Sequence, residues 1–576
     1  MTADNAEEVT NLGRRALLKL AGAAGLSSLG VNQAAAETVS QEQDTDSEMS
    51  FDPIEATVSD IITAIGTGRE TAVSITEQYL ARIEEYDEME AIITVNDNAI
   101  ERAEALDEQL AESGPAGPLH GVPLILKDNN DTADMPTTAG SLSLEESVPP
   151  DDAFLVTQLR DAGGIVLAKA NLHEFARGIE GFSSLGGQTR NPYDLGRNPG
   201  GSSSGTGAAI GANLGVVGTG TDTCGSVRIP SAFQSLVGVR PTMGLLSRDG
   251  IVPLKLTQDT LGPMTRTVRD AAITLDVLVG YDPADPITAR GAQEAPPLTE
   301  SSADSYTDFL DYDGLEGVRI GVLRNLFGAG EDAEEDAAAD AAKVTSVVDS
   351  AIEEMSLYGA EIVDPVEIPN REELLGAAGT DWDREFKRDL NNYLDSLEDP
   401  QFETVEELEA SGLFACRDLA DDMRGAAEAD AENLDENSEF LRANAKKEPL
   451  RDAIRETMVT EDLDVFLYPT VSRTQAEIGE DQDGSNCALS ATSGFPALTM
   501  PAGFTDEGMP VGVELLGKEF DEPLLLQIAF AYEQLTSHRE PPADFGPLPA
   551  DSIDVPNPDY TVEVARESCE DYSYDT

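Results

Sequence analysis

The chain has 576 residues, of which 110 are acidic and 37 basic, so its formal net charge at pH 7 is −73. A chain this negative repels phosphate groups, which excludes nucleic acid as its expected partner. The acidic residues are spread along the whole sequence, so the folded chain repels itself. Molar salt shortens the Debye length to about 3 Å and screens that repulsion. We therefore expect a protein that requires salt.

The first 36 residues predict an export signal. Arg14 and Arg15 precede an apolar run rich in Ala, Gly and Leu, and three alanines follow at 34–36. This arrangement is typical of a twin-arginine signal, and the run is too short and too rich in glycine for a membrane anchor. We expect the twin-arginine machinery as a partner, no stable membrane anchor, and an extracellular or cell-surface location. Residues 37–50 predict a disordered acidic linker.

From residue 51 onward, helical patterns alternate with short apolar runs. Residues 60–65 and 74–86 predict helices, the second with Ser74 and Glu77 as a capping box. The apolar runs predict buried strands at residues 122–126, 165–168, 216–219, 318–323, 465–468, 497–500 and 511–516. The predicted class is α/β, with a large mixed and largely parallel sheet sandwiched between helices.

The boundaries of the fold follow from where the sequence motifs lie. The motifs described below must converge, so we expect a single domain over residues 51–545. Residues 546–576 predict an acidic, disordered tail.

Small and hydroxyl residues concentrate in residues 199–228. The pattern predicts a tight loop at 200–207, a helix at 208–214, a strand at 216–219 and a second loop at 222–226. Backbone N–H groups in such loops suit an anion. The stretch lacks the lysine of a phosphate-binding loop. Two readings remain: a flexible linker, which the patterned apolar chain that follows disfavours, and a serine nucleophile with a base other than histidine.

Candidate bases are few, because the chain has three histidines and nine lysines. Lys127 ends an apolar run at residues 121–128 (GVPLILKD). A lysine at the end of a buried strand is either a costly burial or a working amine with a lowered pKa. We expect packing or hydrogen-bonding roles for His120 and His173, and we expect Lys169 to be a surface lysine at a strand end.

Three stretches, in this order, resemble the amidase signature family. They are residues 121–128, the GGSS loop at 200–203, and residues 221–230 (TDTCGSVRIP). Ser202 and Ser226 lie 24 positions apart, as the family's pattern requires. The resemblance covers about residues 55 to 540 and implies the family's α/β fold. With 28 arginines against nine lysines, the acidic composition also resembles proteins of salt-accumulating halophilic archaea.

The resemblance implies an amidase without a cofactor or metal, acting through two serines and a lysine. Ser226 would be the nucleophile that attacks an amide carbonyl. Ser202, after a cis Gly201–Ser202 peptide bond, would relay its proton to Lys127 as the final base. Burial would lower the pKa of that lysine from about 10.4 towards the working pH.

The loop around the nucleophile carries the other implied roles. The resemblance places the oxyanion hole at the backbone N–H groups of Thr223, Cys224, Gly225 and Ser226. It gives supporting or substrate-binding roles to Ser203, Asp222 and Arg228. Arg228 would either hold Asp222 and the loop in place or bind a substrate carboxylate.

The four cysteines, at 224, 416, 487 and 569, are far apart in the sequence, and we expect no disulfide framework. Cys224 stands where the family commonly has glycine. We interpret it as a small residue that the backbone tolerates; a rival interpretation makes it the nucleophile. No Cys/His cluster has zinc spacing.

The leading hypothesis is an exported amidase that converts a carboxamide to a carboxylic acid and ammonia or an amine. One alternative is the A-type chain of an aminoacyl-tRNA amidotransferase, which needs cytoplasmic partners and tRNA. Another is a catalytically silent binding protein on the same fold, which the presence of all three predicted catalytic residues disfavours. Residues 382–394 resemble a helix of long stand-alone amidases, including the peptide amidase type, and would line the acyl side of the pocket.

Overall fold

The computed structural model describes residues 51–296, 303–330, 333–379 and 381–548. The predicted export signal, the linker at 37–50 and the predicted tail from residue 549 onward lie outside the described residues.

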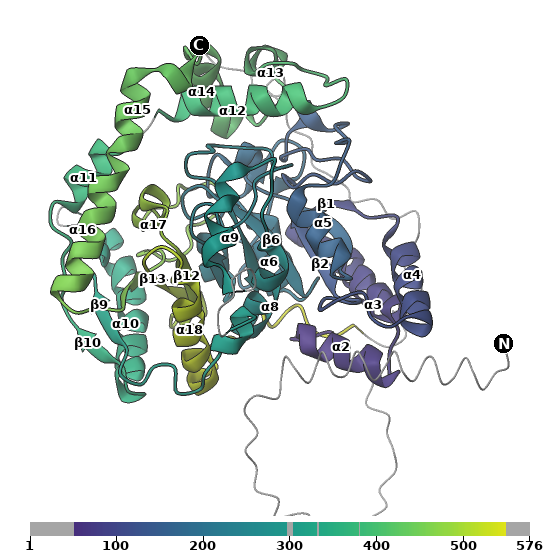
Figure 1. Cartoon of the computed structure of the whole chain (residues 1–576), viewed down its shortest axis with the longest axis horizontal. Helices are drawn as coiled ribbons and strands as arrows, with labels where there is room; N and C mark the ends of the chain where they lie inside the picture. Colours follow the sequence, from purple (N-terminus) through teal and green to yellow (C-terminus); the bar gives the residue numbers. More distant parts are fainter. Residues whose placement is uncertain (1–50, 297–302, 331–332, 380, 549–576) are drawn as a thin grey trace, which may run out of the picture.

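A mixed sheet of eleven strands runs through the molecule in the order β1-β3-β2-β6-β8-β7-β12-β13-β11-β9-β10 (Figure 1). Its strands are β1 Ile92–Val95, β2 Pro123–Lys127, β3 Ile165–Ala170, β6 Val217–Asp222, β7 Val237–Arg240, β8 Thr260–Thr265, β9 Arg319–Val322, β10 Glu361–Val363, β11 Val465–Pro469, β12 Ala497–Phe504 and β13 Pro510–Leu516. Each of the seven predicted strands is present. Most are buried along their whole length, which is why they form continuous apolar runs.

The prediction of a largely parallel sheet is wrong. The β3–β2–β6 and β11–β9–β10 neighbours are parallel, but all pairs from β6 through β8, β7, β12 and β13 to β11 are antiparallel. A continuous apolar run shows that a strand is buried on both faces, but it does not show its direction. A short connection requires an antiparallel pair, as in β12 and β13, which are joined by the turn at residues 505–509; a long connection leaves the direction open, and β7 and β12 are antiparallel too.

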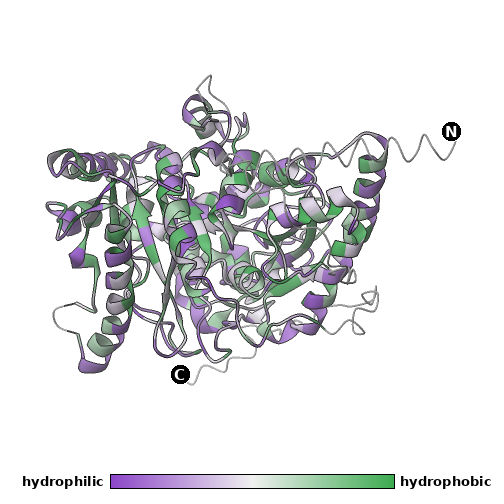
Figure 2. Cartoon of the chain, turned by 90° about the horizontal axis from the view of Figure 1, so that it is seen from below, coloured by the Kyte–Doolittle hydropathy of each residue, from purple (hydrophilic) through white to green (hydrophobic). Residues whose placement is uncertain are grey.

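Helices cover the sheet, and a further group of helices lies over one end of it (Figure 1). They are α2 Val58–Thr67, α3 Ala72–Glu85, α4 Ala99–Glu112, α5 Phe154–Asp161, α6 Ser204–Gly211, α7 Arg228–Phe233, α8 Val268–Leu278, α9 Gly291–Glu294, α10 Glu335–Leu357, α11 Arg371–Ala377, α12 Trp382–Ser396, α13 Val405–Ser411, α14 Cys416–Glu428, α15 Ser438–Ala445, α16 Lys447–Thr460, α17 Ala488–Ser493 and α18 Glu522–Thr536. Hydrophobic residues gather in the strands and the inward faces of the helices (Figure 2). Of the helices described, none is both long enough and apolar enough to cross a membrane.

Helices α12, α13 and α14 share a hydrophobic cluster with loops of the main body. Phe386, Leu408 and Met423 are members, and they pack with Phe175 and Leu254 from loops of the main body. The large cluster of the sheet and its flanking helices is separate. The buried carboxylate of Glu174 accepts the N–H groups of Ser184 and Ala415 at 2.9 and 3.0 Å, which fastens the start of α14 to the main body.

Helix α3 begins one turn before its predicted capping box. Its N-cap is Thr71, whose hydroxyl accepts the Ser74 N–H at 3.0 Å, while the Ser74 hydroxyl accepts the Thr71 N–H at 2.9 Å. Ser74 is therefore the third helical residue of a capping box, and the predicted pairing with Glu77 is wrong. The predicted helix itself is present.

Candidate active site

The site begins where two parallel strands end side by side. Lys127 is the last residue of β2, and Thr221 lies near the end of the adjacent β6. The Nζ atom of Lys127 lies 2.7 Å from Ser202 Oγ and 2.7 Å from Thr221 Oγ1. Asn129 Nδ2 also donates to Thr221 Oγ1, at 3.1 Å. The structure thus brings the predicted base and the predicted relay serine into contact.

Lys127 is fully buried, and this sets its protonation state. Burial lowers the pKa of the Lys127 amine to about 7, although the negative charges of Asp222 and Asp259 act in the opposite direction. A buried ammonium loses its hydration, so burial favours the neutral amine over the charged form. Near pH 7 a large share of Lys127 is therefore a neutral amine, which can accept a proton.

The GGSS loop presents Ser202 from the entrance of helix α6. The Gly201–Ser202 peptide bond is cis. A side chain at Gly201 would place its Cβ 2.8 Å from the backbone of Ile179, so only glycine fits there. The Ser202 carbonyl accepts the His173 N–H at 3.0 Å, and the Ser203 N–H donates to the Ser226 carbonyl at 3.2 Å. Ser203 therefore connects the loop of Ser202 directly to the loop of Ser226.

Asp222 shapes the second loop from inside. Its carboxylate accepts the N–H groups of Gly225 at 2.7 Å and Val227 at 3.3 Å. The Gly225 N–H is therefore occupied by Asp222, and its predicted role as an oxyanion donor is wrong. Among the described residues, no partner is found for the N–H groups of Thr223, Cys224 and Ser226. These three remain as the candidate donors.

Two arginines hold Asp222 in place, and all three side chains are buried. Arg228 Nε donates to Asp222 Oδ2 at 3.0 Å, and Arg240 Nη1 donates to Asp222 Oδ1 at 2.8 Å. Arg228 also pairs with Glu514 on β13 at 2.5 Å. Burial alone would raise the pKa of the Asp222 carboxyl, but the two guanidinium groups hold it well below its usual range. Asp222 is thus an ionised anchor, and Arg228 holds the loop instead of facing a substrate carboxylate.

Cys224 is joined to Cys487 by a disulfide with an S–S distance of 2.00 Å. The expectation of no disulfide, and the interpretation of Cys224 as a merely tolerated small residue, are wrong. The bond could not be predicted from the sequence, because the two cysteines are 263 positions apart. They meet only when the loop of Ser226 packs against the N-terminus of α17. A sulfur held in a disulfide is not a thiolate, so the rival interpretation of Cys224 as nucleophile is also excluded.

Three residues that the sequence did not point to support the site. Thr221 contacts the amine of Lys127, and Asn129 holds Thr221 by donating to its hydroxyl. Asp259 accepts the Thr223 hydroxyl at 2.5 Å, and its other oxygen accepts the N–H groups of Leu254 and Lys255 at 3.0 and 2.7 Å. For Thr221 the available signal was its place just after a predicted strand; Asp259 adjoins no predicted strand, because β8 was not predicted.

Lys169 is not a surface lysine, because its side chain is fully buried. Its Nζ lies 3.2 Å from Asp128 Oδ1 and 2.8 Å from Thr137 Oγ1. Strand β3 lies between β1 and β2, and the apolar run at 165–168 gave no sign that another strand covers its end. The predicted structural roles of the two histidines agree with the structure: His120 Nδ1 accepts the Ala116 N–H, and His173 Nδ1 accepts the Gly181 N–H.

A cavity of about 460 Å³ opens beside the second loop. It is lined by Ala176, Arg177, Gly178, Ile179, Thr223, Cys224, Ser226, Leu254, Trp382, Asp383 and Asp422. Ser226 thus faces a space of substrate size, and α12 and α14 supply one of its walls. Trp382 and Asp383 of the predicted 382–394 helix line the cavity; that they face the acyl part of a substrate stays a prediction. In the part of the chain that the structure describes, no group of His, Cys, Asp and Glu could hold a metal ion.

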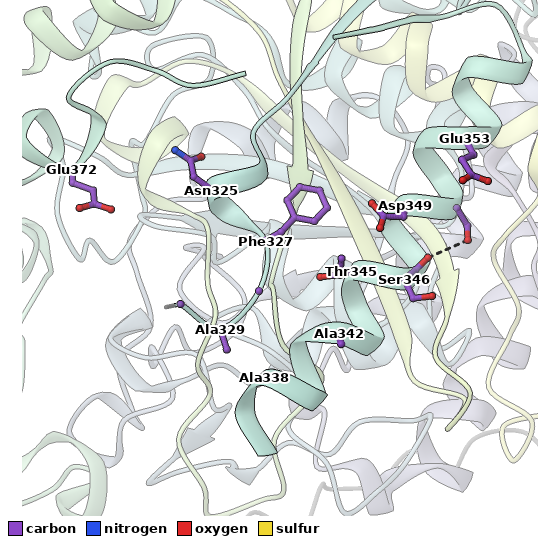
Figure 3. Close-up of a pocket in the computed structure, with 13 residues that line it drawn as sticks. Asn325, Phe327, Ala329, Ala338, Ala342, Thr345, Ser346, Asp349, Glu353 and Glu372 are labelled. Carbon is purple, nitrogen blue, oxygen red and sulfur yellow. Dashed lines mark hydrogen bonds between the residues drawn. The ribbon is translucent and has the colours of Figure 1, made fainter. Parts of the chain in front are cut away.

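A larger cavity, of about 1000 Å³, lies elsewhere (Figure 3). It lies between the segment of Asn325 and Phe327 and helix α10, with Thr345 and Asp349 among its lining. None of the predicted site residues lines it. Size alone therefore does not identify the site; the Lys127–Ser202 contact does.

Comparison with known proteins identifies the family. The amidase family model matches residues 74–526. A probable amidase of Arabidopsis thaliana is 35% identical over 508 residues, covering 85% of this chain and 91% of its own. The A-type chain of the glutamyl-tRNA(Gln) amidotransferase of Symbiobacterium thermophilum is 36% identical over 493 residues, covering 82% and 95%. The solved peptide amidase of Stenotrophomonas maltophilia superposes with a TM-score of 0.74 and 36% identity, covering 85% of this chain and 98% of that one. The chain belongs to the amidase family and is an amide-hydrolysing enzyme.

Proposed function

We propose that the chain hydrolyses the C–N bond of a carboxamide through an acyl-enzyme on Ser226, with Ser202 and Lys127 as its proton relay. The observation that carries the proposal is the 2.7 Å contact between the buried amine of Lys127 and Ser202 Oγ. It lies beside the loop that presents Ser226 to the cavity. A nucleophile, a relay and a base with a pKa of about 7 are the parts that acyl transfer needs.

In the first half of the reaction, Ser226 Oγ attacks the carbonyl carbon of the amide. The Ser226 proton passes to Ser202 Oγ, and the Ser202 proton passes to the neutral amine of Lys127. Negative charge on the carbonyl oxygen is stabilised by the N–H groups of Thr223, Cys224 and Ser226; one such donor is typically worth about 100- to 1,000-fold in rate. When the C–N bond breaks, the leaving nitrogen takes a proton back from Lys127 through Ser202.

The second half repeats the relay with water. Water attacks the acyl-enzyme carbonyl and gives its proton to Ser202, which passes a proton to Lys127. The bond to Ser226 Oγ then breaks, and Ser226 recovers its proton by the same route. The products are a carboxylic acid and ammonia or an amine, and Lys127 ends neutral as it began.

A second candidate is one chain of an amidotransferase complex, because the relative of that name from Symbiobacterium thermophilum is as similar as the plant amidase. The strongly negative charge of this chain disfavours a tRNA-bound partner complex.

We further propose that Arg14 and Arg15 belong to a twin-arginine signal that directs the enzyme out of the cytoplasm. Replacing both arginines by lysine should keep the protein in the cytoplasm, as fractionation of expressing cells would show.

The first test measures ammonia release from aliphatic amides, aryl amides, C-terminally amidated peptides and glutamine, in about 2–4 M KCl. Ser226→Ala should abolish release, while Ser204→Ala, just after the GGSS loop, is a matched control. Ser204 lies at the start of α6, and its hydroxyl has no hydrogen-bond partner among the described residues. Ammonia release that persists in Ser226→Ala would refute the assignment of Ser226 as the nucleophile. Release from glutamine alone would favour the amidotransferase.

A further inference from the structure

The cavity beside Ser226 has two unlike walls. One wall belongs to the catalytic body and includes Ile179 and Leu254; the other comes from α12 and α14 and includes Trp382, Asp383 and Asp422. Trp382 is the only tryptophan of the chain, and 39% of its surface is exposed. An aromatic ring that lies open at a cavity offers a flat apolar face to an entering molecule. The second wall therefore contributes to which amide can bind.

The charge of this wall is negative. Arg177 is the only basic residue among those that line the cavity, and it is flanked by two carboxylates. Its Nη2 lies 2.5 Å from Asp383 Oδ1, and its Nε lies 3.0 Å from Asp422 Oδ2. The two aspartate side chains are 39% and 47% exposed, whereas the Arg177 side chain is 7% exposed, and its Nη1 is buried from solvent. The atoms that face the cavity thus belong mainly to the carboxylates.

A neighbouring lysine does not reverse this sign. The ammonium of Lys255 lies 4.4 Å from the centroid of the Trp382 ring and 3.7 Å from Glu385 Oε1. The side chain of Lys255 is 1% exposed, and that of Glu385 is fully buried. This pair stays beneath the ring and carries no net charge to the cavity. It does hold the ring in place by a cation–π contact.

We propose that the cavity selects amides whose acyl part carries a positive charge beside an apolar group, and that it disfavours amides with a carboxylate there. Trp382, Leu254 and Ile179 would contact the apolar group, while Asp383 and Asp422 would attract the charge. The inference rests on the proposed function, because it takes Ser226 as the residue that attacks the bound amide. It goes beyond the proposed function by specifying which substrate charge the cavity prefers, because the catalytic residues do not set that preference.

Three amides with the same aromatic body test this inference. Phenylalaninamide carries an ammonium, N-acetylphenylalaninamide is neutral, and N-succinylphenylalaninamide carries a carboxylate. Ammonia release in about 2–4 M KCl gives kcat/KM for each, and this salt screens the field of the whole chain, so contacts within a few ångström dominate. We expect kcat/KM to fall in that order, by about three- to tenfold at each step.

Two variants and a matched control assign the preference to the wall. Asp422→Asn should shrink the ratio between the cationic and anionic amides, and Asp383→Asn combined with Asp422→Asn should reverse it, because Arg177 is then unopposed. The control is Asp421→Asn on the same helix; that side chain is 97% exposed and pairs with Arg424. It makes the same change in net charge and should leave the ratio unaltered. Equal kcat/KM for the three amides, or equal effects of Asp421→Asn and Asp422→Asn, would overturn the inference.

Binding without turnover separates this inference from the proposed function. In Ser226→Ala protein the fluorescence of Trp382 should change saturably with phenylalaninamide and far less with N-succinylphenylalaninamide. Continued hydrolysis by Ser226→Ala would refute Ser226 as the nucleophile. The fluorescence titration would then decide the charge preference by itself. Equal, Ser226-dependent hydrolysis of all three amides would refute the charge preference alone. If no amide is hydrolysed, equal binding of the three would still overturn it.

Discussion

Cys224 and Cys487 are joined although they lie 263 positions apart, so the loop that presents Ser226 is covalently tied to the residue that precedes α17. The same contact region contains Arg228, whose Nη2 donates to the Cys487 carbonyl at 3.4 Å. The nucleophile loop is therefore held from two directions: by Asp222 and its arginines below, and by the disulfide at the cavity.

Removing this bond should cost both stability and rate. Removing a native disulfide typically costs about 2–5 kcal/mol, mainly because the unfolded chain gains freedom. We expect Cys224→Ser combined with Cys487→Ser to lower the free energy of unfolding by that amount and to reduce kcat more than it raises KM. Denaturant unfolding and steady-state kinetics at fixed salt check both. An unchanged unfolding midpoint would show that the bond does not stabilise the fold.

The rate should depend on pH through Lys127. The relay needs the neutral amine, whose pKa burial lowers to about 7. We expect kcat/KM to rise about tenfold per pH unit below pH 7 and to level off above it. Measurement from pH 5.5 to 9 at constant KCl checks this. A profile that stays flat across pH 7 would contradict Lys127 as the base.

The same lysine should destabilise the fold. Its pKa is lower in the folded chain than in the unfolded chain, so the unfolded chain binds more protons between about pH 7 and 10.5, and stability rises with pH across that window. Lys127→Met should therefore stabilise the chain by about 3–5 kcal/mol at pH 6 while abolishing activity. The gain should shrink by roughly 3 kcal/mol at pH 9.5. Urea unfolding at the two pH values measures it, and a gain independent of pH would exclude titration of Lys127 as its cause.

Neutralising Asp222 should damage both fold and catalysis. Asp222→Asn leaves the buried Arg228 and Arg240 without their shared carboxylate, and breaking a buried pair typically costs about 3–5 kcal/mol. We expect that loss together with loss of amidase activity. Asp421→Asn, which alters only the exposed pair with Arg424, should cost less than about 1 kcal/mol. Similar losses in the two variants would contradict the anchoring role of Asp222.

The net charge of −73 predicts that the fold depends on salt. At low ionic strength the acidic surface repels itself over longer distances, so we expect the Tm to fall as KCl is lowered from about 3 M to 0.1 M. A neutral osmolyte at the same osmolality should not restore it, since it does not screen charge. Equal Tm values at the two KCl concentrations would refute the prediction.

The resemblance to the amidase signature family pointed to Lys127, Ser202 and Ser226, because its motifs are short stretches of local sequence; the contact between Lys127 and Ser202 is present in the structure. The apolar runs likewise predicted the buried strands. What the sequence could not reveal depends on distant partners. The antiparallel pairing of β7 with β12 joins strands far apart in the sequence, the pairing of Cys224 follows from loop packing, and the burial of Lys169 follows from strand β1 alongside.

The separate hydrophobic cluster of α12, α13 and α14 has an evolutionary consequence. Trp382, Asp383 and Asp422 stand on helices whose core residues, such as Phe386 and Met423, do not belong to the cluster beneath Lys127. Substitutions at the cavity-facing positions of these helices can therefore change which amide is chosen while Lys127, Ser202 and Ser226 stay the same. Related enzymes could therefore evolve different substrate ranges through substitutions in residues 382–428 while catalysing the same reaction.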